Sequence, residues 1–228
     1  TSLHHLSKDA TTGILYALIP DASHVVETNL YAQTAESADP NEYIWWFSDP
    51  PVFDTLAISE GAQSAALADT ATGFLKLCRK NDMGALFAQD EHFQSVDTPY
   101  LNNIASLEFI NDDQLIYATD NDIGRFAYTS TTWAQKEVFT SSQNDIGVME
   151  GITQLITNQN DTMLYVLAKN SKNIISFSLD GFGRPLFLRN STLGDFAPAR
   201  MAISPSEEHL AIVSDTSDSL VLCAIPQV

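Results

Sequence analysis

Residues 153–179 read TQLITNQNDTMLYVLAKNSKNIISFSL, and this stretch decides the fold. Three apolar segments are separated by two polar turns, and no segment keeps a helical spacing of apolar residues for more than a turn or two. Val, Ile, Leu and Tyr dominate the segments, whereas Asn, Asp and Ser fill the turns, as antiparallel hairpins require. The stretch therefore predicts three short antiparallel strands.

The same pattern recurs along the whole chain. Four more copies begin at Leu3, Thr55, Ser106 and Arg200. The polar residue that opens the second turn marks the period, with intervals of 48, 51, 50 and 45 residues between Asp21, Asp69, Asp120, Asn170 and Asp215. A period of this length with several strands in each unit is typical of a β-propeller.

A fourth apolar segment follows each of the first four copies and ends in phenylalanine, at Phe47, Phe87, Phe139 and Phe187. We expect these four residues to hold one equivalent position in four-stranded blades. The fold class is therefore predicted as all-β, a single β-propeller domain with five blades of four antiparallel strands. The predicted blades cover about residues 1–49, 50–95, 96–143, 144–190 and 191–228.

The last blade is one strand short in this prediction, because its third strand already lies at about Leu220 to Ile225. Four complete blades and three further strands make nineteen. A closed ring of five blades is the first expectation. The outer strand of the last blade would then come from another segment or chain, the chain could be a piece of a larger propeller, or the last blade has three strands.

Copies four and five carry a resemblance to a known family. Their sequences are LYVLAKNSKNIISFSLDGFGRPLF (164–187) and ARMAISPSEEHLAIVSDTSDSLVL (199–222). Both resemble the propeller repeats of the YVTN and lactonase-like group, in which a strand ending in Ser-Pro precedes a Leu-Tyr-Val strand and a polar hairpin. The resemblance implies a fold rather than an activity, because propellers host hydrolases, lectins and scaffolds alike.

Charge excludes several classes of function. The 228 residues hold 29 Asp and Glu against 11 Lys and Arg, a net charge of −18, which rules out a nucleic-acid binder that relies on a basic stripe and disfavours an anionic membrane. No apolar run is long enough to span a bilayer. The chain begins at Thr1 rather than Met, which favours a removed upstream segment and an extracellular or periplasmic location, although the compartment stays open.

The two cysteines, Cys78 and Cys223, lie at matching positions of blades two and five, in LKLC and LVLC. We expect both thiols to be free and buried, because whole blades separate them and a disulfide needs Cα atoms within about 7 Å.

Candidate catalytic residues enter the innermost strands, which line the channel of a propeller. Asp54, Glu108 and Glu150 come from blades two, three and four, and carboxylates that converge there can act as acid and base in hydrolysis. His4 and Arg200 enter the same strands in blades one and five and are candidate binding residues.

Two further patterns suggest ligands. Asp120 and Asp122 alternate as the oxygen ligands of a calcium loop do, although a hairpin turn explains the same spacing, so calcium is the one cofactor considered. Trp45 and Trp46 lie on a predicted outer strand and are candidates for binding a sugar or a protein.

Two functions follow from these observations. The first is a non-catalytic propeller that binds a protein or glycan through its faces or channel, with a cationic partner favoured by the acidic surface. The alternative is a small propeller hydrolase of the glycosidase or lactonase type, with or without calcium.

Overall fold

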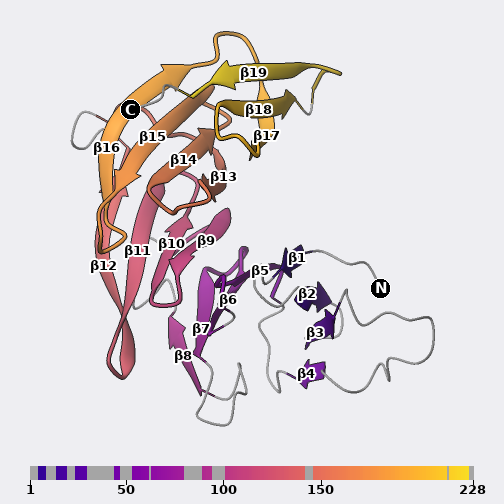
Figure 1. Cartoon of the computed structure of the whole chain (residues 1–228), viewed down its shortest axis with the longest axis vertical. Coiled ribbons are helices and arrows are strands. Elements are labelled where there is room, and N and C mark those ends of the chain that lie inside the picture. The colour runs from indigo at the N-terminus through magenta and orange to yellow at the C-terminus, as the bar shows by residue number, and fades with distance from the viewer. Residues whose placement is uncertain are drawn as a thin grey trace.

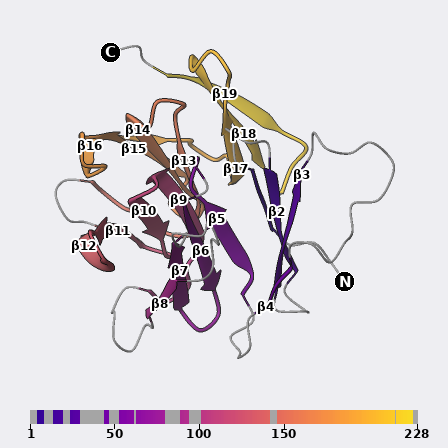
Figure 2. The ribbon, with the colours of Figure 1, turned by 60° about the horizontal axis from the view of Figure 1, so that its bottom comes forward.

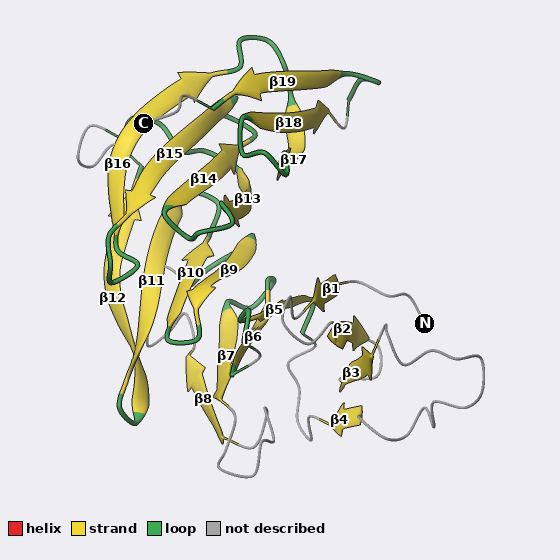
Figure 3. Cartoon of the chain, viewed as in Figure 1, coloured by secondary structure: helices red, strands yellow, loops and turns green. Residues whose placement is uncertain are grey.

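The structure is a computed structural model, and it is built from strands and loops (Figure 3). It describes residues 53–61, 63–79, 101–141, 146–214 and 216–225 in full. In residues 5–8, 14–19, 24–29, 44–46 and 89–93 it describes the strand backbone alone. The all-β prediction is confirmed.

The described strands form five antiparallel sheets in which sequence neighbours are also spatial neighbours. The first sheet contains β1 (His5–Lys8), β2 (Ile14–Ile19), β3 (His24–Asn29) and β4 (Ile44–Trp46). The second contains β5 (Thr55–Ile58), β6 (Ser64–Asp69), β7 (Phe74–Arg79) and β8 (Gln89–Phe93). The third contains β9 (Ser106–Asn111), β10 (Gln114–Ala118), β11 (Asp122–Thr129) and β12 (Thr132–Thr140).

The last two sheets complete the nineteen described strands that the sequence predicts. The fourth contains β13 (Ile152–Thr157), β14 (Met163–Ala168), β15 (Asn173–Leu179) and β16 (Pro185–Thr192). The fifth contains β17 (Pro198–Ile203), β18 (His209–Ser214) and β19 (Leu220–Ala224). The number of blades in a closed ring stays a prediction.

Neighbouring sheets pack against each other in chain order, through the innermost strands β1, β5, β9, β13 and β17. The sheets follow one another along an arc (Figure 1). A tilted view places β5, β9 and β13 toward the middle of the molecule and β12 and β16 at its rim (Figure 2). This is the arrangement of propeller blades.

The core lies between the sheets. Side chains of the second and third sheets share one apolar cluster that includes Leu75, Leu77 and Phe126. The third and fourth share another, with Ile116, Val166 and Phe177. The fourth and fifth share a third cluster, which contains Tyr165, Leu167, Ile174, Met201, Leu210 and Ile212. Alternate residues of each strand therefore face opposite neighbours, because successive side chains of a strand point to opposite faces.

The prediction that the phenylalanines hold one equivalent position is wrong for the two that the structure describes, Phe139 and Phe187. Phe139 pairs with Ile123 at the start of β11, whereas Phe187 pairs with Phe177 near the end of β15. Both rings instead lie about the ring of Phe177, with centroids 6.1 Å from it in each case. Contact with the shared Phe177 ring, rather than an equivalent position in the repeat, explains why both residues are phenylalanine. Phe47 and Phe87 lie outside the described residues.

Neither cysteine forms a disulfide, as predicted. Cys78 is buried, but the prediction of burial is wrong for Cys223, which is half-buried. Cys223 lies on β19, at the outer edge of the three described strands of the fifth sheet, and this edge has less cover than the equivalent strand β7.

Gly124 allows the closest packing in the third sheet. It pairs with Tyr117, whose buried ring occupies the space where a Cβ of residue 124 would lie. The Tyr117 hydroxyl accepts a 2.5 Å hydrogen bond from Gln135 Nε2, which fixes the ring. A shift in the β11–β12 register lies between Gly124 and Phe126, as is common where a glycine sits in a strand.

We expect Gly124→Ala to destabilise the chain by about 2 kcal/mol, because the new methyl group overlaps a buried ring that cannot move away. Urea denaturation measures the change. Gly181→Ala is the control, since a Cβ there meets no atom within 4 Å. Equal free energies of unfolding for the two variants would contradict this account of the packing.

Candidate functional site

The strands of each described sheet alternate in direction, so its turns lie at two opposite ends, and the turns between third and fourth strands lie at the same end as those between first and second strands. We call the first-turn end the one made by the turns that join each innermost strand to the second strand, as in β5–β6, β9–β10, β13–β14 and β17–β18. The second-turn end is made by the turns between the second and third strands. The predicted site residues divide between these two ends.

Asp54 lies at the second-turn end and closes a hairpin. Its carboxylate accepts hydrogen bonds from the backbone nitrogen of Thr70, at 3.1 Å, and from the Thr70 hydroxyl. Its own backbone nitrogen donates to the Ala68 carbonyl at 2.9 Å. These contacts hold the β6–β7 turn against the start of β5.

Glu150 and Asp120 lie at the same end. The Glu150 carbonyl accepts hydrogen bonds from the backbone nitrogens of Asn170 and Ser171, at 3.0 and 3.2 Å. One Asp120 carboxylate oxygen accepts a 3.1 Å hydrogen bond from Asn103 Nδ2, and its carbonyl accepts one from the Ile152 nitrogen. Burial raises the pKa of Asp122. Within the described ranges no three His, Cys, Asp or Glu side chains are placed to hold a metal ion.

Glu108 lies in the middle of β9, on the face of the third sheet that packs against the fourth. Its Oε1 accepts hydrogen bonds from the Thr157 hydroxyl at 3.0 Å and from the Thr157 backbone nitrogen at 3.3 Å. The strand register places Glu108 level with Ile156 of the fourth sheet and Ala202 of the fifth. Glu108 thus places a carboxyl group at a strand position where the next two sheets carry apolar side chains.

Glu108 is therefore well separated from the other two predicted carboxylates along the innermost strands. In the same register Asp54 lies three positions before Glu108, and Glu150 lies six positions before it. At about 3.3 Å for each strand residue, the offset of Asp54 alone amounts to about 10 Å, and Glu150 lies farther in the same direction, before the start of β13. The three carboxylates do not share one level of the channel.

A different set of carboxyl groups comes together at the first-turn end. Burial, followed by the nearby charge of Asp161, raises the pKa of Glu108 to about 7, although the hydrogen bonds from Thr157 act in the opposite direction. Burial and the charge of Glu60 raise the pKa of Asp161 to about 6. We call Glu60, Glu108 and Asp161 the carboxyl cluster; it draws one member each from the second, third and fourth sheets.

Sequence reasoning found Glu108 but missed Glu60 and Asp161. The signal was present, since each described first turn carries a carboxylate, in SEG (59–61), NDD (111–113), NQND (158–161) and SEE (206–208).

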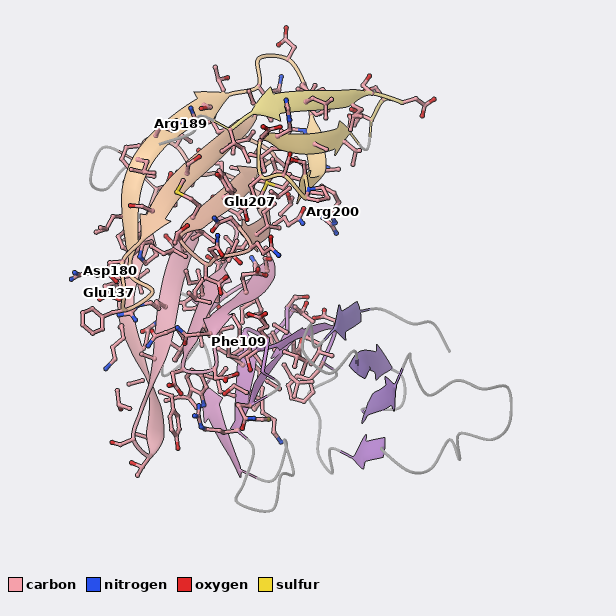
Figure 4. The ribbon with its side chains drawn as sticks, viewed as in Figure 1. Phe109, Glu137, Asp180, Arg189, Arg200 and Glu207 are labelled. Carbon is pink, nitrogen blue, oxygen red and sulfur yellow. The ribbon has the colours of Figure 1, made fainter. Side chains whose placement is uncertain are left out.

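The remaining predicted residues lie elsewhere. Arg200 is exposed on β17, and its guanidinium donates to the Ala199 carbonyl at 3.0 Å. Trp45 and Trp46 lie on β4, paired with Val25 and His24, and their side chains are outside the description. His4 lies outside the described residues. Figure 4 shows Arg200 and Glu207, both of the fifth sheet, away from Phe109 on β9.

In the part of the chain that the structure describes, no helix is long and apolar enough to cross a bilayer.

Comparison with solved structures identifies the fold. A functionally unknown protein from Desulfotomaculum acetoxidans superposes with a TM-score of 0.72 at 14% identity, covering 99% of this chain and 69% of its own. The β-propeller domain of Cps50 (Swd1) from Myceliophteria thermophila gives 0.68 at 12%, covering 98% and 69%. The periplasmic gluconolactonase PpgL of Pseudomonas aeruginosa gives 0.66 at 15%, covering 96% and 65%.

These likenesses show a β-propeller fold and a fold-level resemblance to lactonase propellers. No family model matches the chain, and no curated protein matches it. The chain spans about two thirds of the structures that it resembles. Both a binding module and a hydrolase are compatible with this fold.

We expect Glu108→Gln to stabilise the protein at pH 8 by about 1–2 kcal/mol and to have little effect at pH 5. The pKa rises on folding from 4.5 to about 7, so the penalty is absent below pH 4.5 and develops as pH rises toward 7. That change has a ceiling of about 3 kcal/mol, and residual contact with water reduces it.

Urea denaturation at the two pH values measures this difference. Glu150→Gln is the control, because Glu150 is exposed at the other end. A stability change of equal size at pH 5 and pH 8 would show that Glu108 is not held in an environment that disfavours its charge.

Proposed function

We propose that this chain is part of a non-catalytic propeller module that binds a cationic segment of a protein partner at its first-turn end. The observation that carries the proposal is the charge of this end. Six carboxylates lie in its four described turns, namely Glu60, Asp112, Asp113, Asp161, Glu207 and Glu208. The sequences of these turns contain neither Lys nor Arg.

The second-turn end has mixed charge, since its β14–β15 turn carries Lys169 and Lys172 near carboxylates such as Glu150 and Asp120. Arg184 of the β15–β16 turn, at the same end as the first turns, pairs with Asp180 at 2.9 Å. Arg79 reaches the first turns themselves, and Asp113 already pairs with it at 2.6 Å. Its guanidinium also lies 4.2 Å from the centre of the Tyr128 ring. Arg79 thus ties the second sheet to the third and leaves the other first-turn carboxylates without its charge.

The carboxyl cluster supports the same conclusion. Burial is the main cause of the raised pKa values of Glu108 and Asp161, and the charges of Asp161 and Glu60, respectively, add to it. A bound cation opposes that charge repulsion. Binding of a cationic segment would then release protons near neutral pH. Rigid turns on packed sheets also hold these groups in place before a partner arrives, which reduces the entropy cost of binding.

The test uses a fluorescein-labelled peptide of eight arginines and fluorescence anisotropy at two salt concentrations. We expect binding that weakens with salt. The triple variant Glu60→Gln, Asp161→Asn, Glu208→Gln should weaken it at least about tenfold, because three surface pairs contribute up to about 1 kcal/mol each.

The control is a second triple variant with the same change of charge at the other end, Glu150→Gln, Asp195→Asn, Asp218→Asn. It should change the dissociation constant by less than about twofold. Equal weakening by both triple variants would mean that overall charge, rather than the first-turn end, attracts the peptide. Binding of neutral oligosaccharides without salt dependence would favour a glycan as ligand instead.

Hydrolysis is the second candidate, because a carboxyl group with a pKa of about 7 can donate a proton at neutral pH and gluconolactonase structures share the fold. We expect no turnover of a panel of sugar lactones and aryl glycosides above the uncatalysed rate, since Glu108 is half-buried between two sheets and two hydrogen bonds from Thr157 hold its carboxyl group. Turnover that Glu108→Gln abolishes would replace the binding function with a hydrolase.

A further inference from the structure

One face of the fifth sheet is apolar and exposed. Register places two cross-strand rows on this face, Arg200 with Val213 and Leu220, and Ala202 with Ala211 and Leu222. Leu220 is 59% exposed, Leu222 63% and Val213 42%. The other face carries Met201, Leu210 and Ile212, which are buried against the fourth sheet. Soluble proteins rarely leave a strand face of this kind bare.

The equivalent face of the fourth sheet shows what such a face does in this molecule. Pairing makes Leu155 equivalent to Met201, an offset of 46 residues, so Leu167 corresponds to Val213, Ile174 to Leu220 and Ser176 to Leu222. Leu167, Ile174 and Ser176 are between 0% and 4% exposed, because the fifth sheet covers them. The exposed face thus corresponds, position by position, to a face that packs against a neighbouring sheet.

A polar contact repeats along the same junctions. The Ser106 hydroxyl of the third sheet accepts a 3.0 Å hydrogen bond from the Leu155 nitrogen of the fourth. Gln154 exchanges two hydrogen bonds, of 2.7 and 3.0 Å, with the Met201 backbone of the fifth. Register makes Arg200 equivalent to Gln154, and its guanidinium can donate to a carbonyl as Gln154 does.

The outer edge of the fifth sheet leads to the same conclusion. The third strands of the other sheets, β3, β7, β11 and β15, each pair with a fourth strand, whereas β19 is the outermost described strand of its sheet. An unpaired edge leaves backbone donors and acceptors without sheet partners. The occupant therefore needs a strand for this edge as well as an apolar face.

We infer that the exposed face of β17–β19 is a blade-to-blade interface, and that its occupant is a further four-stranded propeller blade preceded by a strand that pairs with β19. The first sheet of this chain lies beside β5, at the other end of the arc (Figure 1). The matched structures are longer than this chain by enough residues to form such a blade. Five sheets match 69% of the Desulfotomaculum protein, so the other 31% equals about two sheets of the same length.

The test supplies such a blade. A second copy of residues 183–225 is attached directly after Val228, which keeps the 46-residue interval, since position 229 then corresponds to Gly183. The copy offers the β16 sequence as a strand for β19 and the β17–β19 sequences as a new blade. The original and the extended chains are compared by melting temperature, binding of an apolar dye and light scattering.

We expect the extended chain to stay monomeric, to bind at least about twofold less dye, and to melt at least about 5 °C higher. Leu220→Asp with Leu222→Asp in the original sheet should remove these gains in the extended chain, yet leave the melting temperature of the 228-residue chain nearly unchanged. The matched control is Leu186→Asp with Leu188→Asp, in exposed residues on β16 outside this face.

Three outcomes would overturn the inference. An extended chain with unchanged melting temperature and dye binding would show that the face does not accept a blade. A 228-residue monomer that the Leu220 and Leu222 substitutions strongly destabilise would show that the first sheet already covers the face. A dimer that the same substitutions dissociate would identify a second copy as the occupant.

Discussion

Apolar packing between neighbouring sheets is the interaction on which the rest of the molecule depends. The third and fourth sheets each bury one face against the preceding sheet and the other against the following one, as Tyr165 and Leu167 do against Leu210 and Ile212. A fully buried large side chain contributes about 1.5–3 kcal/mol, and every described sheet junction holds several. The turns, hydrogen bonds and carboxylates take their positions from this stacking. A sheet without its neighbour loses the stabilisation and exposes the surface at the same time.

The junctions also explain why Glu108 is unusual. The register that makes it equivalent to Ile156 and Ala202 sends its carboxyl group between two sheets, where Thr157 supplies two hydrogen bonds but little water is available. Desolvation therefore outweighs the hydrogen bonds, and the pKa rises. A chain that needed stability alone would place an apolar side chain there, as the next two sheets do. The Glu108 carboxyl group instead extends the acidic first-turn end, because the charge of Asp161 in that end acts on it.

The sequence predicts strands and sheet order well, because apolar segments and polar turns are local signals that repeat five times. It predicts the surroundings of Cys223, Phe139 and the carboxylates less well, since these depend on strand register and on the packing between neighbouring sheets. Asp54, Glu108 and Glu150 all enter innermost strands, yet a difference of three or six positions in register separates them. Glu60 and Asp161 belong to turns of unequal length, and packing between sheets alone brings their charges into reach of each other.

The carboxyl cluster and the open face of the fifth sheet are independent features of one arrangement. Glu60, Glu108 and Asp161 belong to the second, third and fourth sheets, so two covered junctions fix their relative positions. The open face lies beyond a third junction, on the far side of the fifth sheet. A further blade there would add turns beside Glu207 and Glu208 and so extend the first-turn end, but it would leave the cluster itself unchanged. The charge of the first-turn end is therefore independent of what covers β17–β19.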